Sequence, residues 1–205
     1  MKLPEEFYTR KDVSAIAMEL LGKLIVTKIN NELTTGIISE TEAYAGITDK
    51  ASHAYNNRRT ARTEIMFAKG GFAYVYLCYG VHHLFNVVTN IVDQPDAVLL
   101  RGIIPYNGIV IMEQRMSKVY SNYQFANGPG KASKALGINV INSGESLLGN
   151  KIWIEDIGIK ILPSEISAGS RIGVDYAGSD ASLPYRYFLR HEVLGAIKKK
   201  AQQIR

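Results

Sequence analysis

Residues 72–86 have the sequence FAYVYLCYGVHHLFN, which carries the clearest local signal for the fold. The first half alternates as an extended strand does, so that every second side chain falls on one face: Phe72, Tyr74, Tyr76 and Cys78. Gly80 interrupts the alternation, and residues 82–89 resume it as a partner strand. The stretch therefore predicts a β-hairpin with Tyr79 exposed at or near its tip.

The sequence on either side of this hairpin predicts both helices and strands. Upstream, Asp12 is a candidate N-cap for a helix that Gly22 ends, and residues 23–29 and 33–44 predict a second hairpin. Residues 45–71 lack a clear period, and so long a loop is uncommon unless it is functional or contains a short helix. Downstream, the pattern predicts strands at 97–103, 151–155, 160–162 and 185–190, and helices at 109–116 and 131–136.

The chain shows no internal repeat, linker or low-complexity tract, so we expect a single domain that spans residues 1–205. Its 46% hydrophobic and 21% charged residues are ordinary for a globular protein with a substantial core. The predicted elements indicate an α+β fold, in which one mixed domain contains a curved, largely antiparallel sheet, a protruding β-hairpin and surrounding helices.

Several features bear on the compartment. The single cysteine, Cys78, excludes an intramolecular disulfide and any cluster held by cysteines alone. Residues 1–12 are polar and lack the apolar core of a secretory signal. No apolar run approaches the roughly 18 residues of a membrane-spanning helix. We therefore expect a cytoplasmic protein without membrane contact. If its source is a bacterium, we expect it to act in the cytoplasm and nucleoid.

Basic residues outnumber acidic ones, with a formal net charge of +5 and an isoelectric point of about 9.2. Such a balance favours polyanionic partners. Arg58, Arg59 and Arg62 fall in the loop that precedes the hairpin, where they could follow a phosphate backbone. The terminal run Lys198–Lys200 and Arg205 is expected to be a solvated, frayed end.

Two glutamates lie upstream of the hairpin, in residues 39–55, SETEAYAGITDKASHAY. The strand period places Glu40, Glu42 and Tyr44 on one face. A pair of carboxylates in an apolar setting can act as acid and base, although an edge strand with a solvated face would give the same pattern. The aromatic neighbours favour the catalytic interpretation, and Glu42 lies nearer to them.

The aromatic side chains close to these carboxylates suggest what the site would hold. Tyr44, His53 and Tyr76 could wall a flat, electron-poor ring such as a nucleobase, although Tyr74 and Tyr76 can also be ordinary strand aromatics. Tyr79 would gain little burial before a turn glycine. It is better suited to a wedge pushed into a base stack.

Other chemistries receive less support. Metal binding would need His53, His82 and His83 to act with a carboxylate such as Glu40, Glu42 or Asp49. Because neither HExxH nor HxH spacing is present, we predict no metal. Nucleophilic candidates are weaker, because GxSxG is absent and Cys78 is expected to be a core thiol. Lys69 or Lys131 could form a Schiff base, but neither has an evident desolvating context.

Taken in order, the segments resemble one known family. They are SETEAYAGITDKASHAY, RRTAR, MF, YVYLCYG, HHLFN, AVLLRGIIP, GPGKASKALGI and SRIGV, and they extend from about residue 12 to residue 190. The chain resembles the alkyladenine (3-methyladenine) DNA glycosylases of the single-domain, monofunctional kind, which use no metal. The resemblance implies a mixed α/β domain with a protruding hairpin, in agreement with the pattern at 72–89.

The resemblance also implies roles for single residues. Glu42 corresponds to a general base that activates water, and Arg101 to a basic residue beside it, which we expect to keep Glu42 ionised. Five further positions correspond to the pocket for the base: Tyr44, His53, Tyr76, Asn86 and Leu99. Among them, Asn86 would filter purines that bear a 2-amino group. The positions that would contact DNA are Tyr79, as the inserted wedge, and Arg58, Arg59, Arg62 and Lys131.

The implied activity is removal of alkylated purines from duplex DNA, at the start of base excision repair. The candidates are 3-methyladenine and 7-methylguanine, with hypoxanthine and ethenoadenine as further ones. The base would be flipped out of the helix and its N-glycosidic bond hydrolysed by an activated water. We expect a monomer that uses no cofactor and no metal and whose partner is damaged double-stranded DNA. The alternative is a non-catalytic module that binds distorted or damaged nucleic acid.

Overall fold

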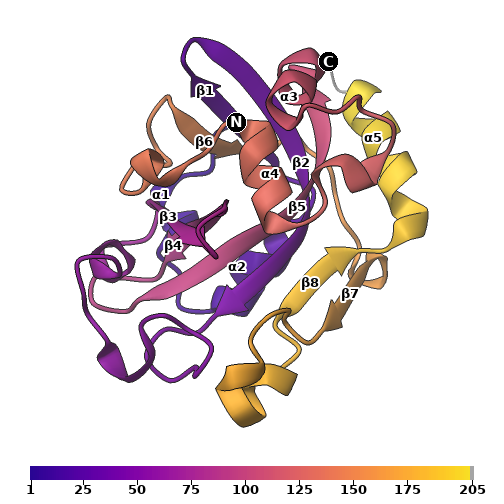
Figure 1. Ribbon diagram of the computed structural model, residues 1–205. Helices are drawn as coiled ribbons and strands as arrows, with labels where there is room; N and C mark the ends of the chain where they lie inside the picture. Colours follow the sequence, from indigo (N-terminus) through magenta and orange to yellow (C-terminus); the bar gives the residue numbers. More distant parts are fainter. Residues whose placement is uncertain (204–205) are drawn as a thin grey trace.

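A computed structural model describes residues 1–203 of the chain. Its centre is one antiparallel sheet with the strand order β3-β4-β5-β2-β1-β6, to which β8 adds beside β2 and β7 beside β8 (Figure 1). The strands are β1 (Leu24–Ile29), β2 (Glu32–Tyr44), β3 (Ala73–Cys78), β4 (His82–Thr89), β5 (Asp96–Asn107), β6 (Ile152–Glu155), β7 (Ile166–Gly169) and β8 (Arg186–Leu189). The sheet is not closed, and the predicted mixed fold with a largely antiparallel sheet is confirmed.

The helices are α1 (Glu5–Tyr8), α2 (Val13–Glu19), α3 (Ile109–Met116), α4 (Pro129–Leu136) and α5 (His191–Gln203). Helix α2 begins as predicted, because the Asp12 side chain accepts a hydrogen bond from the Ala15 N–H at 2.9 Å. Helix α4 begins with Pro129 at its first position and ends at Leu136, where Gly137 caps it with a left-handed φ of 74°.

Helices α2 and α4 pack on opposite faces of the sheet. On one face the Thr41 hydroxyl of β2 donates to the Ala17 carbonyl of α2 at 2.9 Å. On the other, the start of α4 lines the same cavity as Leu99 and Arg101 of β5. The sheet thus has a structural side, covered by α2, and a hollowed side under α4.

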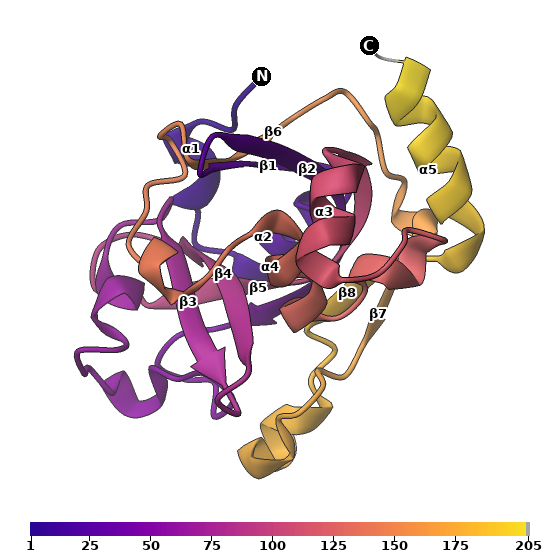
Figure 2. The same cartoon turned by 45° about the horizontal axis from the view of Figure 1, so that its top comes forward.

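The β3–β4 hairpin projects from the sheet beside this hollow, and its turn points downward in the lower half of Figure 2. The strand pairing runs from Ala73–Val87 to Cys78–His82, so the predicted hairpin at 72–89 is present. The loop at 45–71 contains two 3₁₀ helices, Tyr55–Asn57 and Glu64–Phe67, as its length suggested. In both views this loop and α5 lie at opposite sides of the molecule.

Three local predictions are wrong. Residues 160–162 form no strand, because Ile161 packs on Gly22 and pairs with no neighbouring strand. Residues 191–203 form α5 where we expected a frayed end, and Lys198 donates to the Tyr120 hydroxyl at 2.8 Å. Arg205 lies outside the described residues. Cys78 is only half-buried, because it lines the hollow, and it is not a core thiol.

Candidate active site

A cavity of about 390 Å³ lies on the hollowed side of the sheet. Its walls come from five parts of the chain: the β3–β4 hairpin, the middle of β5, the start of α4, the loop after β2 and the segment 172–176. Of the predicted site residues, those that line it are Tyr44, His53, Tyr76, Tyr79, Asn86, Leu99, Arg101 and Lys131. Segments separated by more than a hundred residues thus meet at one hollow.

Glu42 lies beneath this cavity with a side chain that is 0% exposed. Its Oε2 accepts a hydrogen bond from the Tyr44 hydroxyl at 2.8 Å, and its Oε1 accepts one from the Ile172 N–H at 2.8 Å. Arg101 Nη1 lies 3.2 Å from Oε1. All three of these partners line the cavity, so they lie between it and the Glu42 carboxylate. The predicted Glu42–Arg101–Tyr44 grouping exists.

Irregular pairing of β2 with β5 brings the charges together. The register passes from Ile38–Ile103 to Glu40–Gly102 and then to Thr41–Leu100, which leaves Arg101 without a direct partner in β2. Arg101 thereby reaches both carboxylates, with its Nε donating to Glu40 Oε1 at 2.9 Å. As the strand period predicts, Glu40 and Glu42 share a face.

Two opposing effects act on the ionisation of Glu42. Burial raises its pKa above the ordinary value of 4.5, whereas Arg101, the Ile172 N–H and the Tyr44 hydroxyl lower it. The neighbouring Glu40 adds to the increase, and the net pKa is raised. Arg101 therefore acts in the predicted direction without cancelling the effect of burial.

One wall of the cavity is a cluster of three rings. The centroid of His53 lies 4.7 Å from that of Tyr76 and 6.0 Å from that of Tyr74. His53 Nδ1 is 2.8 Å from the Tyr74 hydroxyl, so Tyr74 also belongs to the wall. Burial, with Arg62 and Arg58 nearby, lowers the pKa of His53 to about 4. The imidazole is therefore neutral at pH 7 and adds no positive charge to the cavity.

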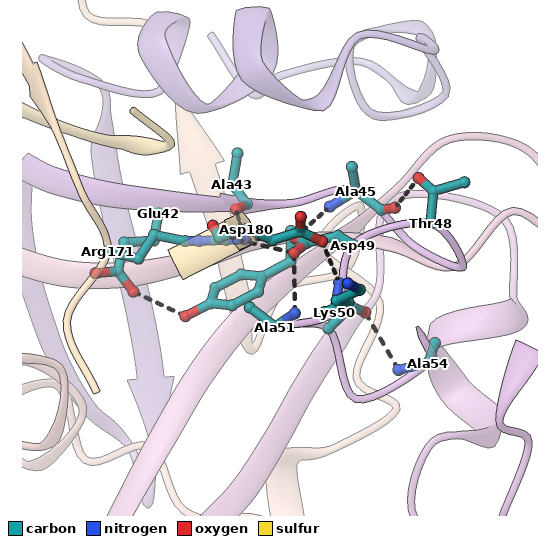
Figure 3. Close-up of polar contacts among 12 residues, drawn as sticks. Glu42, Ala43, Ala45, Thr48, Asp49, Lys50, Ala51, Ala54, Arg171 and Asp180 are labelled. Atoms are coloured by element: carbon teal, nitrogen blue, oxygen red, sulfur yellow. Dashed lines mark hydrogen bonds and ion pairs between the residues drawn. The ribbon is translucent and has the colours of Figure 1, made fainter. Parts of the chain in front are cut away.

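Tyr44 supplies a second wall, and its ring packs on an arginine that the sequence did not single out. The guanidinium of Arg171 lies 4.8 Å from the Tyr44 ring centroid. Arg171 also forms a two-pronged ion pair with Asp49 and donates to the Ala43 carbonyl at 2.9 Å (Figure 3). Asp49 had been considered only as a metal ligand. The pairing joins positions 122 residues apart, which no local pattern reveals.

Asn86 and Leu99 are cross-strand partners that form part of the cavity floor. The Asn86 amide donates to the Tyr74 carbonyl at 3.1 Å and to the Leu84 carbonyl at 3.4 Å. These bonds hold the amide in one orientation. A base entering the cavity would meet a fixed amide group and an aliphatic side chain.

Tyr79 occupies the hairpin turn, and it is 89% exposed. Both Tyr79 and Gly80 have positive φ values, of 50° and 70°, the signs of the type I′ turn that connects short hairpins. A tyrosine in this conformation is strained, and its ring is surrounded by solvent. The predicted exposure at the tip is confirmed.

The four predicted basic contacts differ in their surroundings. Lys131 and Arg58 are exposed, Lys131 at the cavity rim and Arg58 in the preceding loop. Arg59 forms ion pairs with Glu64 at 2.6 Å and Asp93 at 2.8 Å. Arg62 lies over the ring cluster, with Nη2 2.9 Å from His53 Nε2. All four residues are exposed, but within residues 1–203 the charged groups of Lys131 and Arg58 have no side-chain partner.

No group of three or more His, Cys, Asp or Glu side chains within residues 1–203 is arranged to hold a metal ion. The helices in that part of the chain are each too short or too polar to cross a membrane.

Comparison with known proteins gives consistent matches. The family model of the methylpurine-DNA glycosylases (MPG) matches residues 6–193. A protein of Chlamydia abortus that bears the name of a 3-methyladenine DNA glycosylase is 45% identical over 188 residues, which cover 91% of this chain and 97% of the relative. A protein of the same name from Desulfitobacterium hafniense is 39% identical over 204 residues, with 96% and 99% covered.

These matches assign the chain to the DNA glycosylases, the DNA-repair enzymes that hydrolyse the bond between a base and its deoxyribose. Within this class, the chain belongs to the methylpurine-DNA glycosylase family.

Proposed function

We propose that this glycosylase flips alkylated purines out of duplex DNA into the cavity and releases them by hydrolysis. The lesions we propose are 3-methyladenine and 7-methylguanine, with hypoxanthine and ethenoadenine as further candidates. The observation that carries the proposal is the fully buried Glu42 carboxylate, held by three donors beneath an aromatic cavity. A nucleobase fits the chemistry of such walls, and its sugar would lie toward the carboxylate.

The reaction follows from the charge of the lesion. Alkylation at purine N3 or N7 makes the base cationic, which weakens its bond to C1′ and favours contact with the electron-rich faces of Tyr44 and Tyr76. As that bond breaks, its electron pair leaves with the base and positive charge develops on the sugar. Glu42 stabilises this charge and takes a proton from the water that attacks C1′.

The remaining residues have supporting roles in this proposal. Asn86 disfavours purines that carry a 2-amino group, 7-methylguanine among them, relative to 3-methyladenine, and Leu99 packs against the base. Tyr79 enters the gap that the flipped nucleotide leaves and offsets part of the unstacking cost, a few kcal/mol. The four basic side chains, Arg58, Arg59, Arg62 and Lys131, contact the phosphate backbone. For Arg59 and Arg62 this requires that they leave their present partners.

We further propose that the whole chain acts as one domain and as a monomer. Its substrate is chromosomal DNA, which assigns its work to the cytoplasm and nucleoid of a bacterial cell. No lysine forms a covalent bond to the sugar in this mechanism, so treatment with borohydride is expected to trap no covalent adduct with DNA.

The test is base release from duplexes that contain one lesion each. Replacement of Glu42 by Gln (Glu42→Gln) is expected to slow single-turnover release by about 10²–10⁴-fold, since it removes the general base. Binding to abasic-site DNA should remain, because Gln retains an oxygen that can accept the Ile172 bond. The matched control is Glu19→Gln, which makes the same change in an exposed pair with Arg10 and should leave the rate unchanged.

Full activity in the Glu42→Gln variant would contradict the assigned role of this residue. If the unaltered protein binds damaged DNA but releases no base, the non-catalytic binding module replaces the glycosylase. Loss of release in EDTA would instead support metal-dependent hydrolysis.

A further inference from the structure

A buried ion pair lies behind the Tyr44 ring and has no part in the chemistry proposed above. The side chains of Arg171 and Asp49 are 0% and 2% exposed. Arg171 Nη2 donates to Asp49 Oδ1 at 2.8 Å, and Nη1 bonds the other carboxylate oxygen. Nη2 also donates to the Asp180 carbonyl at 3.1 Å. The guanidinium is thus fixed, and Asp49 supplies its counter-charge.

The Arg171 guanidinium packs on the Tyr44 ring without lining the cavity. Tyr44 lines the cavity and Arg171 does not, although the Arg171 Cζ is only 4.8 Å from the ring centroid. A base stacked on the other face would have its centre about 4.5–7 Å from the ring centroid, so roughly 10 Å separates it from the guanidinium. At that separation, charges partly shielded from water by protein still interact.

The buried carboxylates beside the cavity are each paired with a cation. The carboxylates of Glu40, Glu42 and Asp49 are each bonded to a guanidinium, and the guanidiniums belong to Arg101, Arg171 and Arg186. Arg171 stays charged: burial lowers its pKa, but the bonds with Asp49 outweigh this and the pKa is raised. Loss of the Asp49 charge would leave an unbalanced cation behind Tyr44.

We propose that Asp49, by neutralising Arg171 behind Tyr44, allows the cavity to accept purines that carry a positive charge, and so sets the preference for cationic over uncharged lesions. The inference rests on the proposed function, because it concerns the base bound against Tyr44. Asp49 and Arg171 are positioning residues, since they act through the ring and touch no substrate.

A structural role alone predicts something different. The pair ties the loop after β2 to the segment at 171–180, so its loss could loosen Tyr44 for any base. That loss would weaken cationic and uncharged bases alike. An electrostatic role changes the ratio of the two affinities, for the cationic and the uncharged base. For one unbalanced charge about 10 Å from the base and an effective dielectric constant of about 20, the change is about tenfold.

The experiment measures binding to two duplexes that differ only in the charge of one base. One carries 7-methylguanine and the other carries its uncharged isostere 7-methyl-7-deazaguanine, both on 2′-fluoro sugars that resist hydrolysis. Both bases bear a 2-amino group, so any effect of Asn86 cancels in the ratio. The variants are Asp49→Asn, Arg171→Gln and the double variant, with Asp156→Asn as control for a remote ion pair.

The Asp49→Asn variant should lower the preference for the cationic base about tenfold. The double variant, in which an Asn–Gln pair replaces the two charges, should return to within about twofold of the unaltered protein. Arg171→Gln should not lower the preference, and Asp156→Asn should leave it unchanged. A thermal melt identifies any variant that fails to fold.

Three results would overturn the inference: an unchanged ratio in a folded Asp49→Asn variant, a ratio in the double variant about tenfold below that of the unaltered protein, or a lowered ratio in Arg171→Gln. The last two decide the matter even where Asp49→Asn does not fold. Release of ordinary 7-methylguanine by the unaltered protein tests the proposed function separately, because the fluorinated duplexes report binding only.

Discussion

Glu42 illustrates the conflict that a buried catalytic carboxylate must resolve. Water is excluded from it, which strengthens its field at the reacting sugar but disfavours its ionised form. Three donors from three segments, Arg101, the Ile172 N–H and Tyr44, compensate in part, and the pKa remains raised. As the pH falls, Glu42 is therefore protonated, and loses its function as a base, at a higher pH than an exposed glutamate would.

The first prediction concerns this titration. Glu42 acts as a base only when ionised, and burial raises its pKa above 4.5. Single-turnover base release should therefore fall as the pH decreases, with a midpoint above 4.5. Because the ionised form is the one that folding disfavours, the same group costs stability at pH values above its folded pKa. Rates and urea unfolding midpoints measured between pH 5 and 8 test both statements.

Two features separate Glu42 from other groups near the cavity, and comparison with Glu42→Gln is needed because burial raises the pKa of Asp96 to about 6, inside the measured range. His53 has a pKa of about 4, so its titration lies below the measured range. The residual rate of the Glu42→Gln variant should be flat over the same range. A midpoint at or below 4.5 in the unaltered protein would mean that the donors outweigh burial.

At the residue level the sequence revealed what lies within short segments. Glu42 and Tyr44 are two positions apart in a strand, and their shared face follows from the strand period. The Asp49–Arg171 pair could not be found in this way, since its two members come from distant loops whose contact only the tertiary fold creates. Catalytic residues that lie close together in the sequence were predictable, whereas the distant side chains that hold them in place were not.

At the level of elements, the β3–β4 hairpin combines a strained turn with an exposed ring. Tyr79 has a φ of 50°, a conformation that Asn adopts far more readily than Tyr. Its ring has no packing to lose, since it is 89% exposed. A residue unfavourable for the turn is thus present where the proposed function needs a wedge.

The second prediction follows from this conflict. The Tyr79→Asn variant should be as stable as the unaltered protein or more stable, by up to about 1 kcal/mol, because Asn relieves the left-handed strain. Base release from a duplex should fall by at least about tenfold, because the unstacking cost is no longer offset. Release from a single-stranded oligonucleotide with the same lesion should change little, because no stacked partner has to be replaced. Equal losses on the two substrates would contradict the role of a wedge.

The predictability of the elements follows the same rule. The hairpin at 72–89 was found because alternation and a turn glycine lie within one short stretch. Helix α5 was missed although Val193, Leu194 and Ile197 have helical spacing, since the lysine run that follows them suggested a solvated end. Residues 160–162 have the apolar residues of a strand, but a strand also needs a partner, and none pairs with them in the fold.

At the scale of the whole molecule, position distinguishes the basic residues more than their number does. The net charge of +5 favours any polyanion. Lys131 at the cavity rim and Arg58 in the loop that precedes the hairpin are exposed, whereas Arg10 belongs to an exposed ion pair with Glu19 on the α2 side of the sheet. A duplex centred on the hairpin would cover the first two and leave the third in solvent.

The third prediction uses this difference. Each phosphate contact releases condensed counterions, so Arg58→Gln and Lys131→Gln should each reduce the slope of log K against log salt concentration by about 1. Arg10→Gln removes the same charge and should leave the slope nearly unchanged. Binding of an abasic-site duplex, measured by fluorescence anisotropy at several salt concentrations, provides the slopes. Equal changes in all three variants would mean that DNA affinity depends on the total charge alone. The face around the hairpin would then not be the DNA-binding surface.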